Sequence, residues 1–159
     1  MTDHLQARTL AGMLLWMQQP FYDLVQKLCE KLQSPEVLLA GFSGEESDFV
    51  RFNQSRVRQA GRVQQRELNL ELVRGQKHAS ARTTLSGLAD EDHSRGLATL
   101  QSLRQMLDAV PDDPYLLYNT AVQHTENIRP SRLPNSADMV DAILAAGQGL
   151  DLVGFLASG

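Results

Sequence analysis

Residues 67–84 read ELNLELVRGQKHASARTT, and this stretch decides what kind of fold the chain can adopt. Two alternating runs flank Gly75-Gln76, a two-residue connection with glycine first, which is typical of a tight β-hairpin. If Arg74 lies opposite Lys77, one face of the hairpin becomes apolar and the other polar. The pairs are then Leu72–Ala79, Leu70–Ala81 and Leu68–Thr83 on one face, and Glu71–Ser80, Asn69–Arg82 and Glu67–Thr84 on the other. A slip of one residue would mix the faces, so the sequence predicts this register within a half-buried antiparallel sheet.

The chain before this hairpin also alternates with a period of two, which predicts strands throughout residues 36–88. We expect several short strands separated by turns. The predicted strands are Val37–Phe42, Phe49–Phe52, Arg56–Gln59 and Val63–Arg74, with turns at Ser43-Gly44 and Asn53-Gln54 and a bend or bulge at Ala60-Gly61.

Residues 1–34 have a helical period instead. We expect a first helix over His4–Gln18 and a second that starts at Pro20, which suits a first helical turn. Apolar residues of the second helix recur at helical spacing up to Leu32, and Ser34-Pro35 ends it. Cys29, the only cysteine, lies on this pattern, so a buried, inert thiol is expected and an internal disulfide is excluded.

The residues after the hairpin become helical again. Asp92 or Ser94 is a candidate cap for a helix with leucines along one side, and Asn135 or Ser136 is a candidate cap for another. Between them, DDPYLLYN (residues 112–119) suggests a short helix, and a long surface connection follows. Residues 92–147 are therefore expected to be mainly helical, and residues 150–159 to begin a strand whose partner is not evident.

Together these elements predict one α+β domain over residues 1–159. It has a helical N-terminus and an antiparallel meander sheet with helices packed on one face. Because the chain ends in an apparent strand, we expect it to be the N-terminal part of a longer two-domain protein.

Composition narrows the function classes. The 159 residues carry a net charge of −4, which does not suit a protein that coats nucleic acid or an anionic membrane. No apolar run is long enough to span a bilayer and no signal peptide opens the chain, so a cytoplasmic protein is expected. The charge is uneven, however: the basic segment Arg51–Arg82 contains eight Lys or Arg against two acids.

Motif searches find no complete catalytic or metal-binding set. No Gly-x-Ser-x-Gly motif, phosphate-binding loop or zinc-type histidine pair is present. The stretch DEDH at residues 90–93 could offer metal ligands, but acids that complement a helix dipole explain it as well. His78 is expected on the polar face of the hairpin. We therefore predict no catalytic residue, no metal ligand and no cofactor in these residues.

The stretch SDFVRFNQSRVRQAGRV (residues 47–63) contains the candidate binding residues. These are Arg51, Asn53, Arg56, Arg58 and Arg62. Three interpretations stay open: a solvated strand face beside acids, a protein or peptide interface that uses the planar guanidinium, and a nucleic-acid site. A turn at Asn53-Gln54 would place Arg51 opposite Arg56, and two facing cations favour an anion over them.

The same region resembles the N-terminal part of the TldD/PmbA family of metallopeptidases. The resemblance is carried by Arg51-Phe52-Asn53 and by Ser55-Arg56-Val57-Arg58-Gln59. It continues in DDPYLLYN (residues 112–119) and in RPSRLPNSADMVDAILAAGQGLDLVG (residues 129–154), so it covers about residue 36 onward. These motifs are structural rather than catalytic. The amino-acid sequence of the strand region is more similar to the PmbA-like type of the family.

The resemblance implies a longer chain that works as a homodimer or with a related TldD-type subunit. In the family, a His-Glu-x-x-x-His zinc motif lies beyond the N-terminal domain and serves proteolysis of unfolded or modified peptides. That motif is absent here. We therefore expect a segment that is inactive alone and contributes to dimer assembly and a channel for extended peptides, with zinc bound elsewhere in the assembly. The alternative is a non-enzymatic regulatory module, a modulator of DNA gyrase or a nucleic-acid binder; nucleic acid is the less favoured partner.

Overall fold

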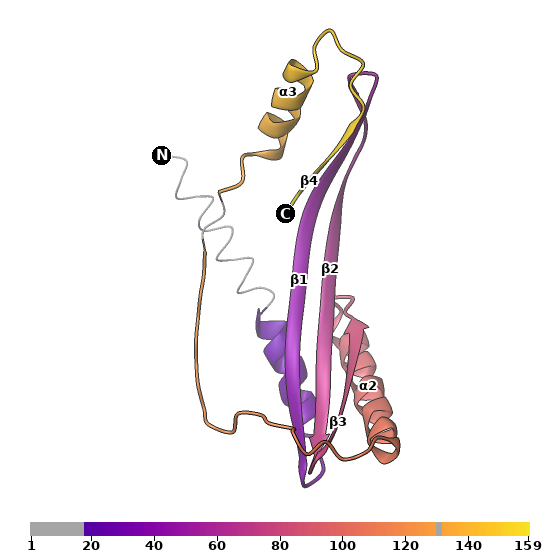
Figure 1. The fold of residues 1–159 in the computed structure, drawn as a ribbon, viewed down its shortest axis with the longest axis vertical. Helices are drawn as coiled ribbons and strands as arrows, with labels where there is room; N and C mark the ends of the chain where they lie inside the picture. Colours follow the sequence, from indigo (N-terminus) through magenta and orange to yellow (C-terminus); the bar gives the residue numbers. More distant parts are fainter. Residues whose placement is uncertain (1–17, 130–131) are drawn as a thin grey trace. The chain divides into compact units, whose positions relative to one another are not determined.

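The structure, a computed structural model, describes residues 18–129 and 132–159 (Figure 1). The predicted helix over His4–Gln18 lies almost wholly outside these residues. The chain divides into two compact units. Unit 1 comprises residues up to Ser43 together with Arg66–Asn127, and unit 2 comprises Gly44–Gln65 with Ile128–Gly159.

The described residues form a four-stranded sheet in the order β3-β2-β1-β4, with helices before and after the main hairpins (Figure 1). The predicted α+β class is confirmed. The strands are β1 (Glu36–Asn53), β2 (Arg56–Arg74), β3 (Lys77–Thr84) and β4 (Gly154–Ser158), and the helices are residues 18–29, α2 (Ala89–Ala109) and α3 (Ser136–Ala146).

The β2–β3 hairpin has the predicted register. Arg74 pairs with Lys77, and the pairing continues without a slip to Glu67 and Thr84. Gly75 opens the connection with φ of +65°, a conformation that glycine adopts at little steric cost. The register brings the leucines of β2 onto one face, where the core of unit 1 forms.

The prediction of several short strands before this hairpin is wrong. β1 and β2 have 18 and 19 residues and run without interruption through Ser43-Gly44 and Ala60-Gly61. Each strand has the other as a hydrogen-bonded neighbour, and that pairing keeps these small residues extended despite their turn propensity.

The turn between β1 and β2 lies one residue later than predicted, at Gln54-Ser55. Both residues have positive φ, of 52° and 55°, as a type I′ hairpin turn requires. Ser55 is held by residues from the other end of unit 2. Its N–H donates to the Leu152 carbonyl at 3.1 Å, the Leu152 N–H donates to its hydroxyl at 3.0 Å, and that hydroxyl also donates to the Leu150 carbonyl. These distant partners explain why local sequence did not reveal the turn.

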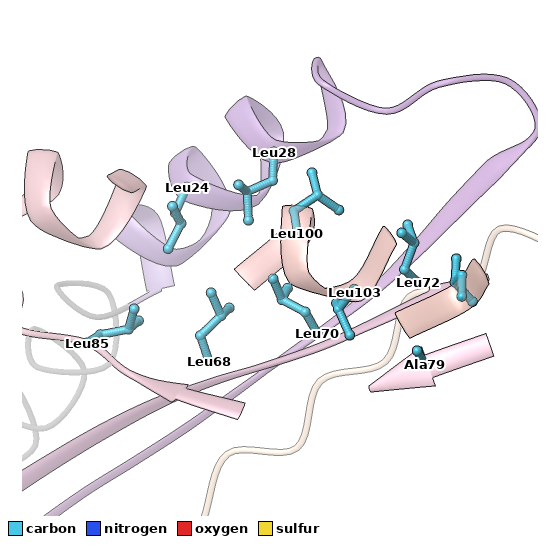
Figure 2. Close-up of a cluster of buried hydrophobic side chains, with 10 residues drawn as sticks. Leu24, Leu28, Leu68, Leu70, Leu72, Ala79, Leu85, Leu100 and Leu103 are labelled. Atoms are coloured by element: carbon cyan, nitrogen blue, oxygen red, sulfur yellow. The ribbon is translucent and has the colours of Figure 1, made fainter. Parts of the chain in front are cut away.

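Unit 1 has a leucine core between the sheet and two helices (Figure 2). The helix at residues 18–29 and α2 both pack on the leucine face of β2. The fully buried leucines are Leu28, Leu68, Leu70, Leu72, Leu100, Leu103 and Leu107. Gly96 permits the close approach of the two helices, because a Cβ there would lie only 3.2 Å from both methyl groups of Leu28.

Three local predictions around the helices need correction. Cys29 is exposed rather than buried, because it follows the core residue Leu28 and so falls on another face of the helix. The stretch DDPYLLYN contains a turn and no helix. Neither Asp92 nor Ser94 caps α2; Asp92 lies inside its first turns and accepts bonds from the backbone of Ser86 and Gly87, which precede the helix.

Unit 2 contains the ends of the long hairpin, α3 and β4. The predicted cap at Asn135 is confirmed, since its side chain accepts from the Ala137 N–H at 2.8 Å. The predicted C-terminal strand is present as β4, but it has a partner: it pairs antiparallel with β1, from Asp48–Ser158 to Phe52–Gly154. Val50 and Phe52 are buried on one side of this part of the sheet.

Truncation of a buried leucine is expected to destabilise the protein far more than truncation of an exposed one. We expect Leu70→Ala to lower the free energy of unfolding by about 2–5 kcal/mol, because it removes buried methyl groups and leaves a cavity. Leu117→Ala is the matched control: Leu117 is 92% exposed, and its truncation should stay within about 0.5 kcal/mol. Urea unfolding of both variants measures the difference, and equal effects would contradict this core.

A partly buried ion pair links the start of β1 to α2 within unit 1. The Glu36 side chain is only 2% exposed, and Arg104 donates to both of its carboxylate oxygens at 2.8 Å. Arg104 also donates to the Lys31 carbonyl at 2.7 Å, so it holds the chain that follows the helix at residues 18–29. The hydrogen bonds from Arg104 lower the pKa of Glu36 even though burial acts in the opposite direction.

We expect Arg104→Met to destabilise the protein by up to about 3 kcal/mol at neutral pH, because the buried Glu36 carboxylate loses its cationic partner. Because the folded-state pKa of Glu36 is depressed, the pair stabilises fully above the ordinary carboxyl value of 4.5. This contribution disappears as the pH falls through the lower, folded-state pKa. The gap between wild type and variant should therefore shrink in acid, and a gap that is constant with pH would contradict the assignment.

Candidate partner-binding site

The five predicted binding residues all lie in unit 2, but the structure brings together only three. Arg51 and Asn53 on β1 and Arg58 on β2 line one shallow hollow. We call it the arginine hollow; its other lining residues are Phe52, Gln59, Val153, Gly154 and Phe155. Arg56 and Arg62 do not line it.

The observed turn changes which arginines face one another. A two-residue turn at Gln54-Ser55 puts Asn53, not Arg51, opposite Arg56, while Arg51 and Arg58 line the same hollow. The predicted pairing of Arg51 with Arg56 is wrong for this reason. Among the described residues, neither Arg51 nor Arg58 forms an ion pair or a side-chain hydrogen bond, and no acid lines the hollow. Two like charges in this position repel unless an anion lies over them.

Arg62 has a different role, because its guanidinium is already occupied. Its Nε donates to Asp48 at 2.7 Å, and a terminal nitrogen lies 3.1 Å from Glu46. The Ser136 hydroxyl also donates to Asp48 at 2.9 Å, at the start of α3. Hydrogen bonds from Arg62 and then Ser136 lower the pKa of Asp48. Arg62 therefore stabilises unit 2 through internal ion pairs, and its guanidinium is not available to bind a partner.

Sequence reasoning missed the aromatic component of the site. Phe155 of β4 pairs with Arg51 of β1, and its ring stacks on that of Phe49 with centroids 6.2 Å apart and planes 16° apart. Phe155 is 61% exposed. The ring of Phe49 in turn fills the space beside Gly61, where a Cβ would come within 2.7 Å of it. Only the pairing of β4 with β1 reveals this neighbourhood, so no local pattern could have indicated it.

One edge of β2 is open next to this site. β3 pairs with β2 only from Glu67 onward, and the Leu85 N–H adds a bond to the Arg66 carbonyl. For residues 56–65, no strand of the described part of the chain lies on the side away from β1. Such an edge presents unpaired N–H and C=O groups that can accept another strand.

Acids neutralise much of the basic segment elsewhere. Besides Arg62, Arg74 pairs with Asp108 at 2.6 Å, and Arg82 pairs with Glu67 at 3.3 Å. These contacts agree with the solvated-face interpretation for those positions. They leave Arg51 and Arg58 as the two cations of the segment that share a hollow without a carboxylate.

His78 occupies a second polar cluster, in unit 1. Its Nδ1 lies 2.7 Å from Glu71 and its Nε2 lies 3.3 Å from Asp113. The hydrogen bond with Glu71, and more weakly that with Asp113, raises the pKa of His78. The Asp113 N–H also donates to the Gln76 carbonyl at 2.7 Å, so the cluster holds the residues after α2 against the β2–β3 turn.

We expect Glu71→Gln to lower the pKa of His78, which an NMR titration of the imidazole measures. Because the folded-state pKa is raised, the cluster stabilises fully below the ordinary value of 6.5, and this stabilisation disappears as the pH rises through the raised value. Glu126→Gln, at an exposed position, is the control and should leave the titration of His78 unchanged. A His78 pKa that does not respond to Glu71→Gln would contradict this geometry.

Acidic residues of the stretch DEDH (residues 90–93) make contacts within α2 and with the loop that precedes it. Both carboxylate oxygens of Asp92 are taken by Ser86 and Gly87, and Glu91 lies 3.6 Å from Arg95 along α2. Within the described ranges, no group of three or more His, Cys, Asp or Glu is arranged to hold a metal ion.

Comparison of the sequence with protein-family models yields no match, and comparison with curated proteins yields none either. The resemblance to the TldD/PmbA family therefore stays a prediction from the strand motifs. None of the helices in the described residues combines the length and the apolarity needed to cross a bilayer.

Proposed function

We propose that this chain is a non-catalytic binding segment of a peptidase assembly of the TldD/PmbA type. Its role is to join a second subunit, either another copy or a related TldD-type chain, and to help guide extended peptides. The zinc ion and the residues that cleave peptides belong to other parts of such an assembly, since the sequence lacks His-Glu-x-x-x-His. The motifs around Arg51 and Arg58 support the family assignment.

The observation that carries this proposal is the arginine hollow. Two guanidinium groups without a carboxylate partner lie beside the exposed Phe155 ring. Arginine next to an aromatic ring is typical of protein-binding surfaces, because the planar fork binds carboxylates and the ring supplies apolar area. The expected ligand is therefore an extended segment that carries Asp or Glu next to apolar residues.

The open edge of β2 gives such a segment a way to bind through its backbone. An added strand would bond to the free N–H and C=O groups of β2 from Arg58 to Gln65 and so lie next to Arg58. Backbone bonds do not depend on side-chain identity, so they suit a protein that handles varied peptides. The arginines would then select for acidic positions.

The alternative of a nucleic-acid or gyrase-binding module rests on the charge of the basic segment. Ion pairs to Asp48, Asp108 and Glu67 reduce the charge available for phosphates. Phosphate binding also predicts a steep dependence on salt and similar losses for each exposed arginine. The peptide proposal instead predicts different effects at Arg56 and Arg58.

A fluorescent peptide with the sequence Val-Glu-Val-Glu-Val-Glu-Val tests the proposal by anisotropy. We expect Arg51→Glu and Arg58→Glu each to weaken binding by about tenfold or more, because each loses a charge-assisted hydrogen bond and adds repulsion. Arg56→Glu makes the same change of charge outside the hollow and should alter affinity by less than about threefold.

Peptide with glutamine in place of glutamate should bind at least about tenfold more weakly. Equal binding of both peptides, or equal losses at Arg56 and Arg58, would contradict the proposal. Binding of a DNA duplex that responds to all three arginines alike would favour the nucleic-acid alternative.

A further inference from the structure

Unit 1 contains a more enclosed hollow that the proposed function does not use. Its walls come from the helix at residues 18–29, from β1 and from the start of α2, and its volume is about 280 Å³. This is near the lower end of the size of small-molecule sites, about 300 Å³, and far above the roughly 30 Å³ of one water molecule. We call it the histidine hollow; its apolar lining residues are Pro20, Phe21, Leu24, Phe42, Leu85 and Ala89.

The acidic and basic side chains that line this hollow differ in how many of them already have a partner. The acids are already engaged: Asp92 accepts from Ser86 and Gly87, and Asp23 accepts from the Gln19 side chain at 2.8 Å. Lys27 has no ion pair within the described residues. Lys27 is therefore less well satisfied than the acids of the hollow.

Arg66 adds positive charge at the same place. Its guanidinium lies against Gly87, so close that any side chain at residue 87 would displace it. Gly87 also has φ of +85°, which disfavours other residues. The loop before α2 thus has a shape that brings Arg66 to the hollow.

His93 contributes a buried ring nitrogen to this hollow. It lines the hollow, and its Nε2 is buried without a hydrogen-bond partner in the described structure. Buried polar atoms in native proteins nearly always have a partner, and an exception points to a bound group or water. A half-turn of the imidazole about Cβ–Cγ exchanges its nitrogens with ring carbons within the same outline, so the ring can reorient toward a ligand without repacking.

We propose that the histidine hollow binds a small monocarboxylic acid with an aromatic or branched apolar body. The carboxylate would accept hydrogen bonds from the imidazole of His93 and the ammonium of Lys27, and the body would pack against Phe21, Leu24 and Phe42. A neutral apolar molecule would leave the Lys27 ammonium and His93 Nε2 without a partner, and a polyanion would place charge on the apolar wall. This site is separate from the arginine hollow, so its test does not depend on the proposed function.

The test uses 4-fluorophenylacetate and its neutral amide as probes in fluorine NMR with the full chain. We expect the acid to bind in the millimolar range and the amide at least about tenfold more weakly, because a charge-assisted hydrogen bond is lost. Nitrogen NMR of wild-type protein should show a shift of the His93 Nε2 signal when the acid is added.

Substitutions then test which side chains bind the acid. Lys27→Gln and His93→Leu should each weaken binding of the acid by about fivefold or more, whereas His124→Leu, at an exposed position in unit 1, should leave it unchanged. Lys27 is exposed on its helix, so its replacement tests the site without threatening the core. Equal binding of acid and amide, no binding of the acid, or no loss in Lys27→Gln would overturn the proposal. Contacts in the ligand-free protein between the His93 ring and residues 1–17 would overturn it as well, since the chain itself would then fill the hollow.

Discussion

The packing of the β2 leucines against two helices is the constraint on which unit 1 depends. Leu68, Leu70 and Leu72 share a face only because the β2–β3 hairpin keeps a single register, and a slip of one residue would turn all three to the opposite face. The same face receives Leu28 from the helix at residues 18–29 and Leu103 from α2 (Figure 2). The Glu36–Arg104 pair then fixes the ends of these elements, with polar contacts at the margin of an apolar core.

Sequence reasoning succeeded where the deciding interactions are local. The hairpin at Gly75-Gln76 and the cap at Asn135 involve partners a few residues apart, and both were predictable. It failed where residues far apart in the sequence determine the local conformation. Ser43-Gly44 stays extended because a neighbouring strand holds it, and the turn moves to Gln54-Ser55 because Ser55 bonds to Leu150 and Leu152, 95 and 97 residues away.

The candidate site shows the same division. Charge identified Arg51 and Arg58, and the family-like motif added Asn53; all three line one hollow. Charge alone could not separate Arg58 from Arg62, because the carboxylate that occupies Arg62 belongs to Asp48 on the adjacent strand. Phe155 was missed altogether, since its position beside Arg51 follows from the pairing of β4 with β1. A site made by strands from both ends of a chain is visible only once the sheet order is known.

The bonds between Ser55 and residues 150–152 also have a consequence for biosynthesis. A ribosome completes the β1–β2 turn about a hundred residues before it makes Leu150 and β4. During that interval the turn lacks its hydrogen-bonding partners, and β1 lacks the strand that will cover its edge from Asp48 to Phe52. Contacts of such long sequence separation form late in folding. A nascent chain therefore displays Val50 and Phe52 on an unfinished strand edge, where chaperones or a premature partner can reach them.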